Sequence, residues 1–273
     1  MTSPPKVKLK PGDTIGILGG GQLGRMLATA ASRLGVPDVG LLTMTEMVDA
    51  ARAIVQAVRV PVIADADTGY GNPLNVIRTV HEYERAGVSA IHLEDQVAPK
   101  RCGHLRGKQV IPAGEMAQKI QAAATARSSP DFLLIARTDA RAVEGLDGAI
   151  ERARRYRDAG ADVLFVEAPQ TESEVEQVAR ELGDVPLLFN WAEGGRTPPI
   201  TVERLRELGY AVVIFPISTL LSATTAIRRT LEVIRRQGTP ATVLPELVQF
   251  GDFLDFIGLP EIDALGRRYA NGH

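Results

Sequence analysis

A regular alternation of short apolar segments and longer amphipathic segments runs through the middle of the chain, and it restricts the fold more than any other feature. The apolar segments are short enough for buried strands, and the stretches between them, such as residues 74–86 and 149–159, have helical spacing. Repeated strand–helix units predict a parallel sheet, and at 273 residues a TIM-type (β/α)8 barrel is the favoured closed form. A doubly wound open sheet is the alternative. The expected strands are residues 61–66, 90–95, 132–138, 162–167, 186–191 and 211–216.

The chain contains no linker that would divide it, so we expect a single α/β barrel domain over residues 1–273. Thr43, followed three residues later by Glu46, predicts a capping box at a helix start. Residues 14–18 read as a strand, and a further strand would have to come from residues 39–42. The expected parts are a poorly ordered, Pro- and Lys-rich segment at 1–13, an atypical Gly-rich βα unit at 14–35, the barrel at 36–237, and C-terminal helices at 238–273.

The C-terminal region has more apolar surface than closing a barrel requires. One helix is expected from Ser218 to about residue 236, and two more over residues 245–257 and 260–269. The stripe of Leu247, Phe250, Leu254 and Ile257 predicts a face that packs on a neighbouring subunit, in a homodimer or a homotetramer.

Composition excludes several other classes of protein. The net charge of -2 gives no electrostatic footprint for nucleic acid, and no apolar run reaches membrane-spanning length. The N-terminus lacks the apolar segment of a signal peptide. A single cysteine rules out an internal disulfide and fits a reducing cytoplasm. We therefore expect a cytoplasmic protein with a small-molecule substrate.

Acidic residues follow two neighbouring strands where those strands are expected to end. Asp65 and Asp67 are two residues apart, so on a strand both point to the same face. Glu94 ends the next strand. Three converging carboxylates would repel one another unless a hard cation joined them, which predicts Mg2+, with Mn2+ as the other possibility. The alternative is that these carboxylates cap the following helices and pair with surface lysines.

The other strand ends carry groups suited to an anionic substrate. A guanidinium such as that of Arg137 binds a carboxylate through two hydrogen bonds, and neutral donors complete such a site. These groups meet at one end of a barrel, where catalytic residues are found. The alternative for Arg137 is a buried ion pair in the core. The strand-end residues are Arg137 and Asp139, Glu167, Asn190 and Glu193, and Pro216 with Ser218.

A cationic, glycine-containing loop lies between two of these strand ends, at residues 98–108. Its composition suits a lid over an anion. Cys102 lies between Arg101 and His104, surroundings that lower a thiol pKa and allow proton exchange. The alternative is an inert cysteine in the core. His92, inside a strand, is expected to be structural.

Taken together, these segments resemble the isocitrate lyase/phosphoenolpyruvate mutase superfamily, from about Ala30 to the C-terminus. The resemblance implies an eight-stranded barrel with a C-terminal helix swapped between subunits, and Mg2+-dependent chemistry on 2-oxo acids. The motifs that carry it are Asp65-Ala-Asp-Thr-Gly-Tyr-Gly71, Leu93-Glu-Asp-Gln96, Lys100-Arg-Cys-Gly-His104, Ile135-Ala-Arg-Thr-Asp-Ala140, Glu167-Ala-Pro169 and Asn190-Trp-Ala-Glu-Gly-Gly-Arg-Thr-Pro198.

The resemblance also implies roles for individual residues. The catalytic set would be Cys102, Arg137, Glu167 and His104, and the metal set would be Asp65, Asp67 and Glu94. Substrate contacts would come from Asp38, Lys100, Gly103, Arg137, Asn190, Glu193 and Ser218.

The cysteine-containing motif is similar to that of the carbon–carbon lyases, and 2-methylisocitrate lyase-like proteins give the best match. The implied reaction is a retro-aldol cleavage in which a base removes a hydroxyl proton and Cys102 protonates the departing enediolate. The alternatives within the superfamily are a carboxyphosphonoenolpyruvate phosphonomutase and an oxaloacetate decarboxylase. A catalytically impaired barrel is a further alternative.

The first thirty residues depart from the superfamily pattern. Residues 11–35 instead resemble the opening βα unit of the ATP-grasp enzyme 5-(carboxyamino)imidazole ribonucleotide synthase, so the chain looks like a chimera. Gly19, Gly21 and Gly24 match a pattern that binds phosphate or carboxylate at a helix start. This loop would have to replace the usual carboxylate-binding loop of the superfamily.

Overall fold

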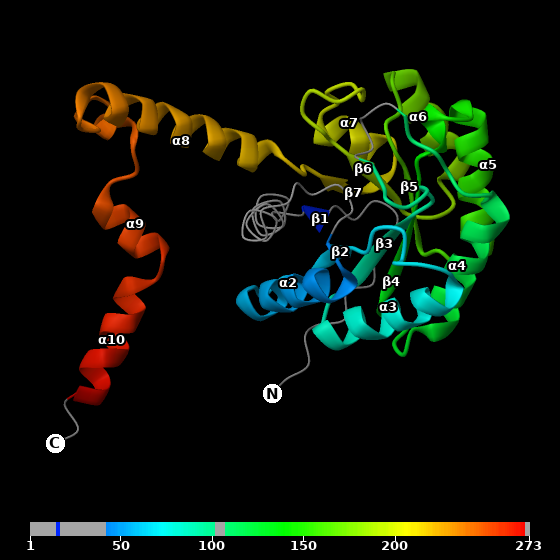
Figure 1. Ribbon diagram of the computed structural model, residues 1–273, viewed down its shortest axis with the longest axis horizontal. Coiled ribbons are helices and arrows are strands. Elements are labelled where there is room, and N and C mark those ends of the chain that lie inside the picture. The colour runs from blue at the N-terminus through cyan, green and yellow to red at the C-terminus, as the bar shows by residue number, and fades with distance from the viewer. Residues whose placement is uncertain (1–14, 17–41, 102–106, 271–273) are drawn as a thin grey trace. The chain divides into compact units, whose positions relative to one another are not determined.

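A computed structural model describes residues 15–16, 42–101 and 107–270 (Figure 1). Its centre is a sheet of seven parallel strands, in the order β1-β7-β6-β5-β4-β3-β2. All six strands expected between residues 61 and 216 are confirmed, and part of the expected 14–18 strand is present as β1. The strands are β1 (Ile15–Gly16), β2 (Ile63–Asp65), β3 (Ala90–Glu94), β4 (Leu133–Thr138), β5 (Val163–Val166), β6 (Leu187–Asn190) and β7 (Tyr210–Ile214).

The prediction of an eight-stranded barrel is confirmed only at the level of a parallel α/β sheet. Six principal strands, β2 to β7, form a half-barrel, and the two-residue β1 pairs with β7 at one edge. Within the described ranges no strand joins β1 to β2. The expected strand at residues 39–42, the atypical unit at 14–35 and the segment 1–13 lie largely outside the described residues.

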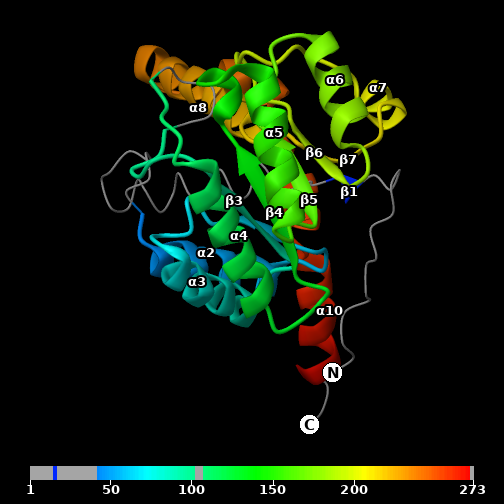
Figure 2. The same cartoon turned by 90° about the vertical axis from the view of Figure 1, so that its right-hand side faces the viewer.

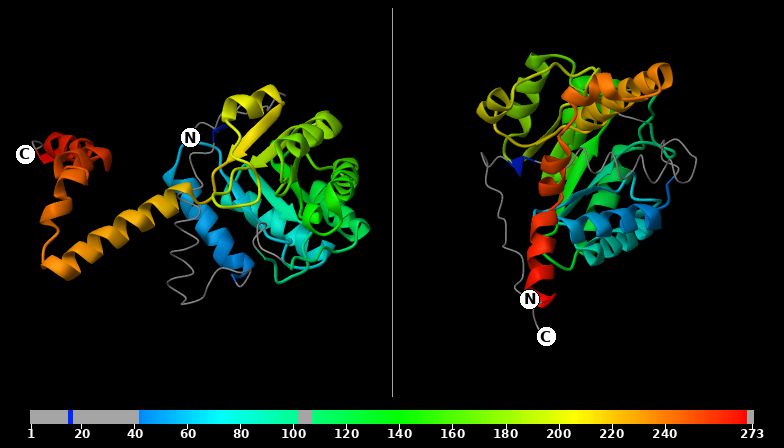
Figure 3. Two further views of the ribbon diagram at one scale, coloured as in Figure 1. Left: turned by 90° about the horizontal axis from the view of Figure 1, so that it is seen from above. Right: turned by 90° about the vertical axis from the view of Figure 1, so that its left-hand side faces the viewer.

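Helices cover the outer face of this sheet. The view from above in Figure 3 shows them around the outside of the strands, and Figure 2 shows α3, α4 and α5 next to one another along β3 and β4. The predicted capping box is confirmed, because Thr43 Oγ1 accepts from the Glu46 amide and the Glu46 carboxylate accepts from the Thr43 amide. The helices are α2 (Met44–Ala57), α3 (Pro73–Ala86), α4 (Ala113–Ala126), the 3-10 turn η1 (Ala140–Ala142), α5 (Gly145–Asp158), α6 (Glu172–Leu182) and α7 (Val202–Glu207).

The two faces of the sheet have different cores. On β3, Ile91 and Leu93 point outward into the large core under the helices, whereas Ala90 belongs to a small apolar cluster on the inner face. The inner cluster consists of Ala90, Ile135, Val163, Phe165, Leu188, Ala211 and Val212. Because side chains alternate along a strand, the inner face continues beyond these apolar residues into the strand ends.

The chain divides into two compact units, Met1–Leu220 and Leu221–His273. The helix predicted after Ser218 is confirmed as α8 (Ser218–Gln237), and the last predicted helix as α10 (Leu259–Ala270). The helix predicted over residues 245–257 is wrong at its start: η2 (Ala241–Glu246) is a 3-10 turn that contains Pro245, and α9 (Phe250–Phe256) begins later. Proline inside a helix removes a backbone hydrogen bond, which explains the interruption.

No helix in the described part of the chain is long and apolar enough to cross a lipid bilayer.

Candidate active site

The inner face of the sheet changes from apolar to charged within two residues. On β4, Arg137 follows Ile135, and on β5 Glu167 follows Phe165. Since alternate residues share a face and parallel strands end at the same edge, these polar groups must meet there. Cross-strand register places Glu94 beside Arg137 and Asp65 beside His92. The polar residues brought to this edge are Asp65, Asp67, His92, Glu94, Arg137, Asp139, Glu167 and Asn190.

Asp65 and Asp67 share the ammonium group of Lys100. The Lys100 Nζ lies 3.2 Å from Asp65 Oδ2 and 2.7 Å from Asp67 Oδ1. The alternative prediction, that these carboxylates pair with surface lysines, is thus met in part. The lysine in question, however, is largely buried and belongs to the loop at 98–108. Burial opposes ionisation of Asp65, but the positive charge around it prevails, and its pKa lies well below the ordinary value. The charges that lower the pKa of Asp65 are those of His92, Lys100 and Arg137.

The turn that carries Asp67 depends on unusual backbone angles. Asp67 and Tyr70 have φ values of 48° and 58°, and Gly69 has a φ of 82°. A Cβ on Gly69 would lie 2.6 Å from Val76 Cγ2, so only glycine fits there. The hydroxyl of Tyr83 donates to the Asp65 carbonyl at 3.0 Å, which fixes the start of the turn. The Asp-Thr-Gly-Tyr-Gly sequence therefore positions a carboxylate.

Glu94 is a buried carboxylate without a hydrogen bond. Neither of its side-chain oxygens has a hydrogen-bond partner, and its nearest cation is Arg137, with Nη1 3.2 Å from Oε2. Burial raises the pKa of Glu94, and this effect exceeds the lowering by the charges of Arg137 and Lys100, so the pKa is about 8. A buried carboxylate that accepts no hydrogen bond is costly to ionise, so this group is a candidate ligand for a further cation.

The donor set of the site is rich in carboxylate oxygens. The carboxylates of Asp65, Asp67, Glu94, Asp139 and Glu167 lie along this edge beside Lys100, Lys108 and Arg137. A donor set of this kind fits a hard divalent cation. As placed, no three acidic, histidine or cysteine side chains in the described ranges form a ready metal site, and the Lys100 ammonium lies between two of the predicted ligands. The assignment of Asp65, Asp67 and Glu94 as metal ligands stays a prediction.

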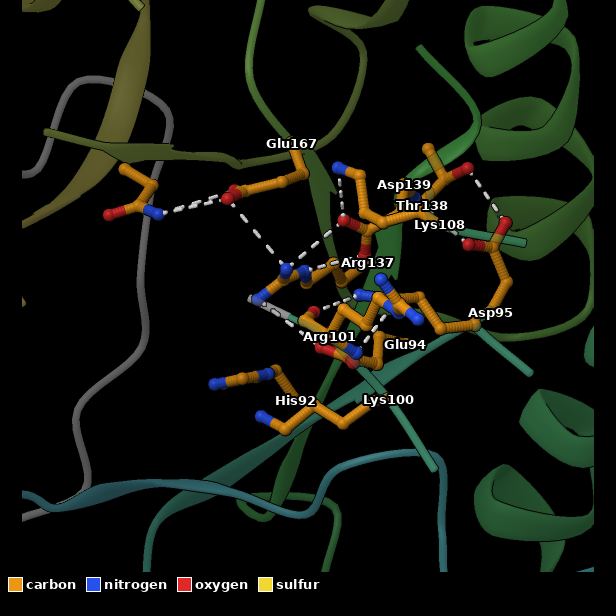
Figure 4. A network of polar contacts seen from close by, with 12 residues as sticks. His92, Glu94, Asp95, Lys100, Arg101, Lys108, Arg137, Thr138, Asp139 and Glu167 are labelled. Atoms are coloured by element: carbon orange, nitrogen blue, oxygen red, sulfur yellow. Dashed lines mark hydrogen bonds and ion pairs between the residues drawn. The ribbon is translucent and has the colours of Figure 1, made fainter. Parts of the chain in front are cut away.

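Arg137 lies at the centre of the network in Figure 4. Its Nε and Nη2 donate to Asp139 at 2.9 and 3.2 Å, and its Nη2 lies 3.7 Å from Glu167 Oε1. The guanidinium also lies over the ring of Phe165, 5.1 Å from its centre. Arg137 therefore forms the buried ion pairs that the sequence analysis gave as its alternative role. These contacts also hold the guanidinium at the edge of the sheet where the sequence predicts the substrate site.

Unsatisfied polar atoms mark the same edge of the sheet. In the described residues, seven buried side-chain polar atoms have no hydrogen-bond partner, and all belong to β3, β6 or the loop after β6. Buried polar groups are normally paired, so this concentration indicates a ligand site. The atoms are His92 Nδ1, Glu94 Oε1 and Oε2, Asn190 Oδ1, Glu193 Oε1 and Oε2, and Thr197 Oγ1.

The remaining predicted site residues have different outcomes. Asn190 Nδ2 donates to both oxygens of Glu167, at 3.3 and 3.2 Å, which joins β6 to the network. Glu193 lies in the loop after β6, and Ser218 begins α8; their substrate contacts stay predictions. The predicted residues Asp38, Cys102, Gly103 and His104 lie outside the described residues, as does the glycine loop at 19–24.

Sequence reasoning missed three residues of this network. His92 was expected to be structural, but its Nδ1 lies 3.6 Å from Asp65 Oδ1 and shares the inner face with Glu94. Lys108 Nζ donates to Asp139 Oδ1 at 2.9 Å, and Asp95 is fully buried. The spacing of His92 two residues before Glu94 is a signal that would have indicated a shared face.

The fold and the site together define a class of protein: a parallel α/β enzyme domain whose strand ends form a buried acidic centre beside a guanidinium. Comparison with known proteins agrees with this class. The family described as phosphoenolpyruvate phosphomutase matches residues 26–235. The 2,3-dimethylmalate lyase of Eubacterium barkeri is 48% identical over 243 residues, which cover 89% of this chain and 84% of that protein. The 2-methylisocitrate lyase of Aeropyrum pernix is 48% identical over 231 residues, covering 85% and 74%.

Solved structures extend the likeness to three dimensions. A crystal structure of 2,3-dimethylmalate lyase has a TM-score of 0.83 and 37% sequence identity, over 96% of this chain and 92% of that one. A phosphonopyruvate hydrolase in complex with oxalate and Mg2+ has a TM-score of 0.77 and 32% identity, over 91% and 85%. The chain belongs to the phosphoenolpyruvate mutase/isocitrate lyase superfamily.

Proposed function

We propose that this protein is a Mg2+-dependent carbon–carbon lyase that cleaves a small hydroxy di- or tricarboxylate, similar to 2-methylisocitrate, into a 2-oxo acid and, respectively, a mono- or dicarboxylate. The observation that carries the proposal is the buried acidic edge of the sheet beside Arg137, where neither side-chain oxygen of Glu94 accepts a hydrogen bond. Relatives that are named as lyases of such acids, and that share nearly half of the residues, support the same reaction class.

Asp65, Asp67 and Glu94 would hold the cation, directly or through water. When bound, the cation would supply positive charge to the oxygens of the developing 2-oxo acid. Lys100 would then leave the two aspartates and turn its ammonium toward the substrate anion. Support for this comes from the side-chain oxygens of Glu94, which accept no hydrogen bond, and from the position of Lys100 between Asp65 and Asp67.

Arg137 would bind a substrate carboxylate in the proposed reaction. Asp139 and Glu167 orient its guanidinium, and the Phe165 ring below it keeps water from one side. Asn190 would donate to the substrate from β6. By resemblance to the lyases, Cys102 would protonate the departing dicarboxylate, with His104 beside it.

We propose in addition that the sheet closes as an eight-stranded barrel and that the C-terminal helices pack on a second copy of this chain. Apolar side chains in the second unit support the assembly, because Phe250 and Phe256 are 76% and 85% exposed, and Ile227 and Leu231 are 58% and 60% exposed. Exposed apolar surface on this scale is costly in water. Light scattering during gel filtration tests the homodimer or homotetramer directly, and a monomer at micromolar concentration would contradict it.

The test of the function is release of a 2-oxo acid with Mg2+ from 2-methylisocitrate, 2,3-dimethylmalate and isocitrate. EDTA and the Cys102→Ser variant serve as controls, and both should abolish release. Activity on oxaloacetate that survives Cys102→Ser would instead indicate a decarboxylase. A folded protein that binds Mg2+ but releases no product from any of these compounds would contradict the lyase proposal.

A further inference from the structure

Asp95 is a fully buried carboxylate on the opposite face of β3 from the site. Its Oδ2 accepts from the hydroxyls of Thr138 and Tyr156, each at 2.7 Å. Its Oδ1 accepts from the backbone amide of Asp139 at 2.9 Å. Of these three donors, Thr138 is the last residue of β4 and Asp139 follows it, so together they fix the end of that strand relative to β3.

Arg152 on α5 supplies the charge that balances Asp95. Its Nη1 lies 3.3 Å from Asp95 Oδ2 and donates to the Ile111 carbonyl at 2.8 Å. Its Nε and Nη2 bind both oxygens of Glu144, at 2.7 and 2.6 Å. A guanidinium held by two hydrogen bonds to one carboxylate has little rotational freedom. Arg152 therefore gives Asp95 a partner whose position is fixed.

Asp139 connects this buried group to the site. Its backbone amide is held by Asp95, while its side chain accepts from Arg137 and from Lys108. Moving the Asp139 backbone therefore moves the carboxylate that orients the guanidinium. Displacement of a positioned group by about an ångström is enough to cost about a hundredfold in rate.

We propose that Asp95, braced by Tyr156 and Arg152 of α5, is a positioning residue that sets the Arg137 guanidinium for the substrate anion. The inference rests on the proposed function in that it takes the ligand of Arg137 to be a small carboxylate. Asp95 itself lies behind the strand and acts through Asp139. Its effect should thus appear in anion binding more than in metal binding or in folding.

The variants that test this proposal differ in one hydroxyl. Tyr156→Phe removes a donor to Asp95 and keeps the buried ring, while Tyr210→Phe removes a hydroxyl that donates to the Val175 carbonyl at 3.1 Å on the outer face of the sheet. Both tyrosines are almost completely buried, so the two changes are matched in burial and chemistry. Thr138→Val and Thr138→Ser form a second pair, in which only serine keeps the hydroxyl.

The readout is oxalate affinity in saturating Mg2+, measured by calorimetry. Mg2+ affinity and thermal unfolding are measured for each variant as controls. We expect Tyr156→Phe and Thr138→Val to weaken oxalate binding about three- to tenfold, less than the full value of the hydrogen bond lost, because that bond acts on Arg137 only through Asp139. Tyr210→Phe and Thr138→Ser should bind oxalate as the unmodified protein does. Mg2+ affinity should change less than twofold in all four variants.

Equal oxalate affinities for Tyr156→Phe and Tyr210→Phe would overturn the proposal, and so would failure of Thr138→Ser to restore binding. A protein that binds no oxalate would overturn it as well. Because oxalate binding needs no turnover, the two proposals separate. Weakened binding in Tyr156→Phe, with no lyase activity in the unmodified protein, would support the positioning role and contradict the proposed reaction.

Discussion

Two lysine–aspartate groups in the same site differ in how far they are buried. Lys108 and Asp139 have side chains that are 1% and 0% exposed, whereas Lys100 is 18% exposed and its partner Asp65 is 22% exposed. Asp139 also has Arg137 as a second partner. The comparison predicts that the Lys108 pair belongs to the fixed frame of the site, and that the Lys100 pair opens when a divalent cation binds.

The largest effect is expected for Lys108→Met. It leaves Asp139 buried with one of its two cations removed, and breaking a buried pair in this way costs about 3–5 kcal/mol of unfolding free energy. Urea unfolding measures the loss, and a second change of Asp139 to Asn should recover part of it. A loss below about 1 kcal/mol would mean that the two lysine groups are equivalent.

Divalent cation should stabilise the folded protein through the Asp65 group. At a Mg2+ concentration of about 100 times the dissociation constant, we expect a gain of about 2.7 kcal/mol in unfolding free energy. Thermal unfolding with Mg2+ and with EDTA gives the measurement. Asp65→Asn removes a predicted ligand and should abolish the gain; a stabilisation that persists in this variant would place the cation elsewhere.

Lys100→Met should tighten divalent cation binding. The variant removes a competing positive charge from Asp65 and Asp67, and we expect about a tenfold lower dissociation constant, or about 1.4 kcal/mol. Electron paramagnetic resonance of free Mn2+ measures this without substrate. Weaker binding in the variant would show that Lys100 supports the cation site and does not compete with it.

The smallest effect is expected for Arg154→Gln on α5. This arginine pairs with Glu181 at 2.6 Å, but its side chain is 38% exposed and that of Glu181 is 36% exposed. Exposed pairs contribute about 0–1 kcal/mol, so urea unfolding should show a change in that range, well below that of Lys108→Met. If Arg154→Gln lowered the unfolding free energy as much as Lys108→Met, burial would not explain why one ion pair contributes more than the other.

The edge residues Asp65, Glu94 and Arg137 were predictable because parallel strands end together and their side chains alternate between two faces. The same reasoning did not reveal Asp95, which points to the opposite face and contacts a helix more than fifty residues away through Tyr156. It also treated His92 as structural, since nothing in a single strand shows which neighbour lies across from it.

The sequence by itself determined the strand and helix rhythm, the acidic strand ends and the superfamily. Apolar periodicity and local capping are short-range properties, so they can be read along the chain. Only the tertiary structure decided which charges pair. Lys100 pairs with Asp65 and Asp67, and Lys108 pairs with Asp139; these pairings depend on cross-strand register and on burial. Those two quantities arise only after distant segments have packed, because the strength of each charge pair depends on the neighbours that exclude water from it.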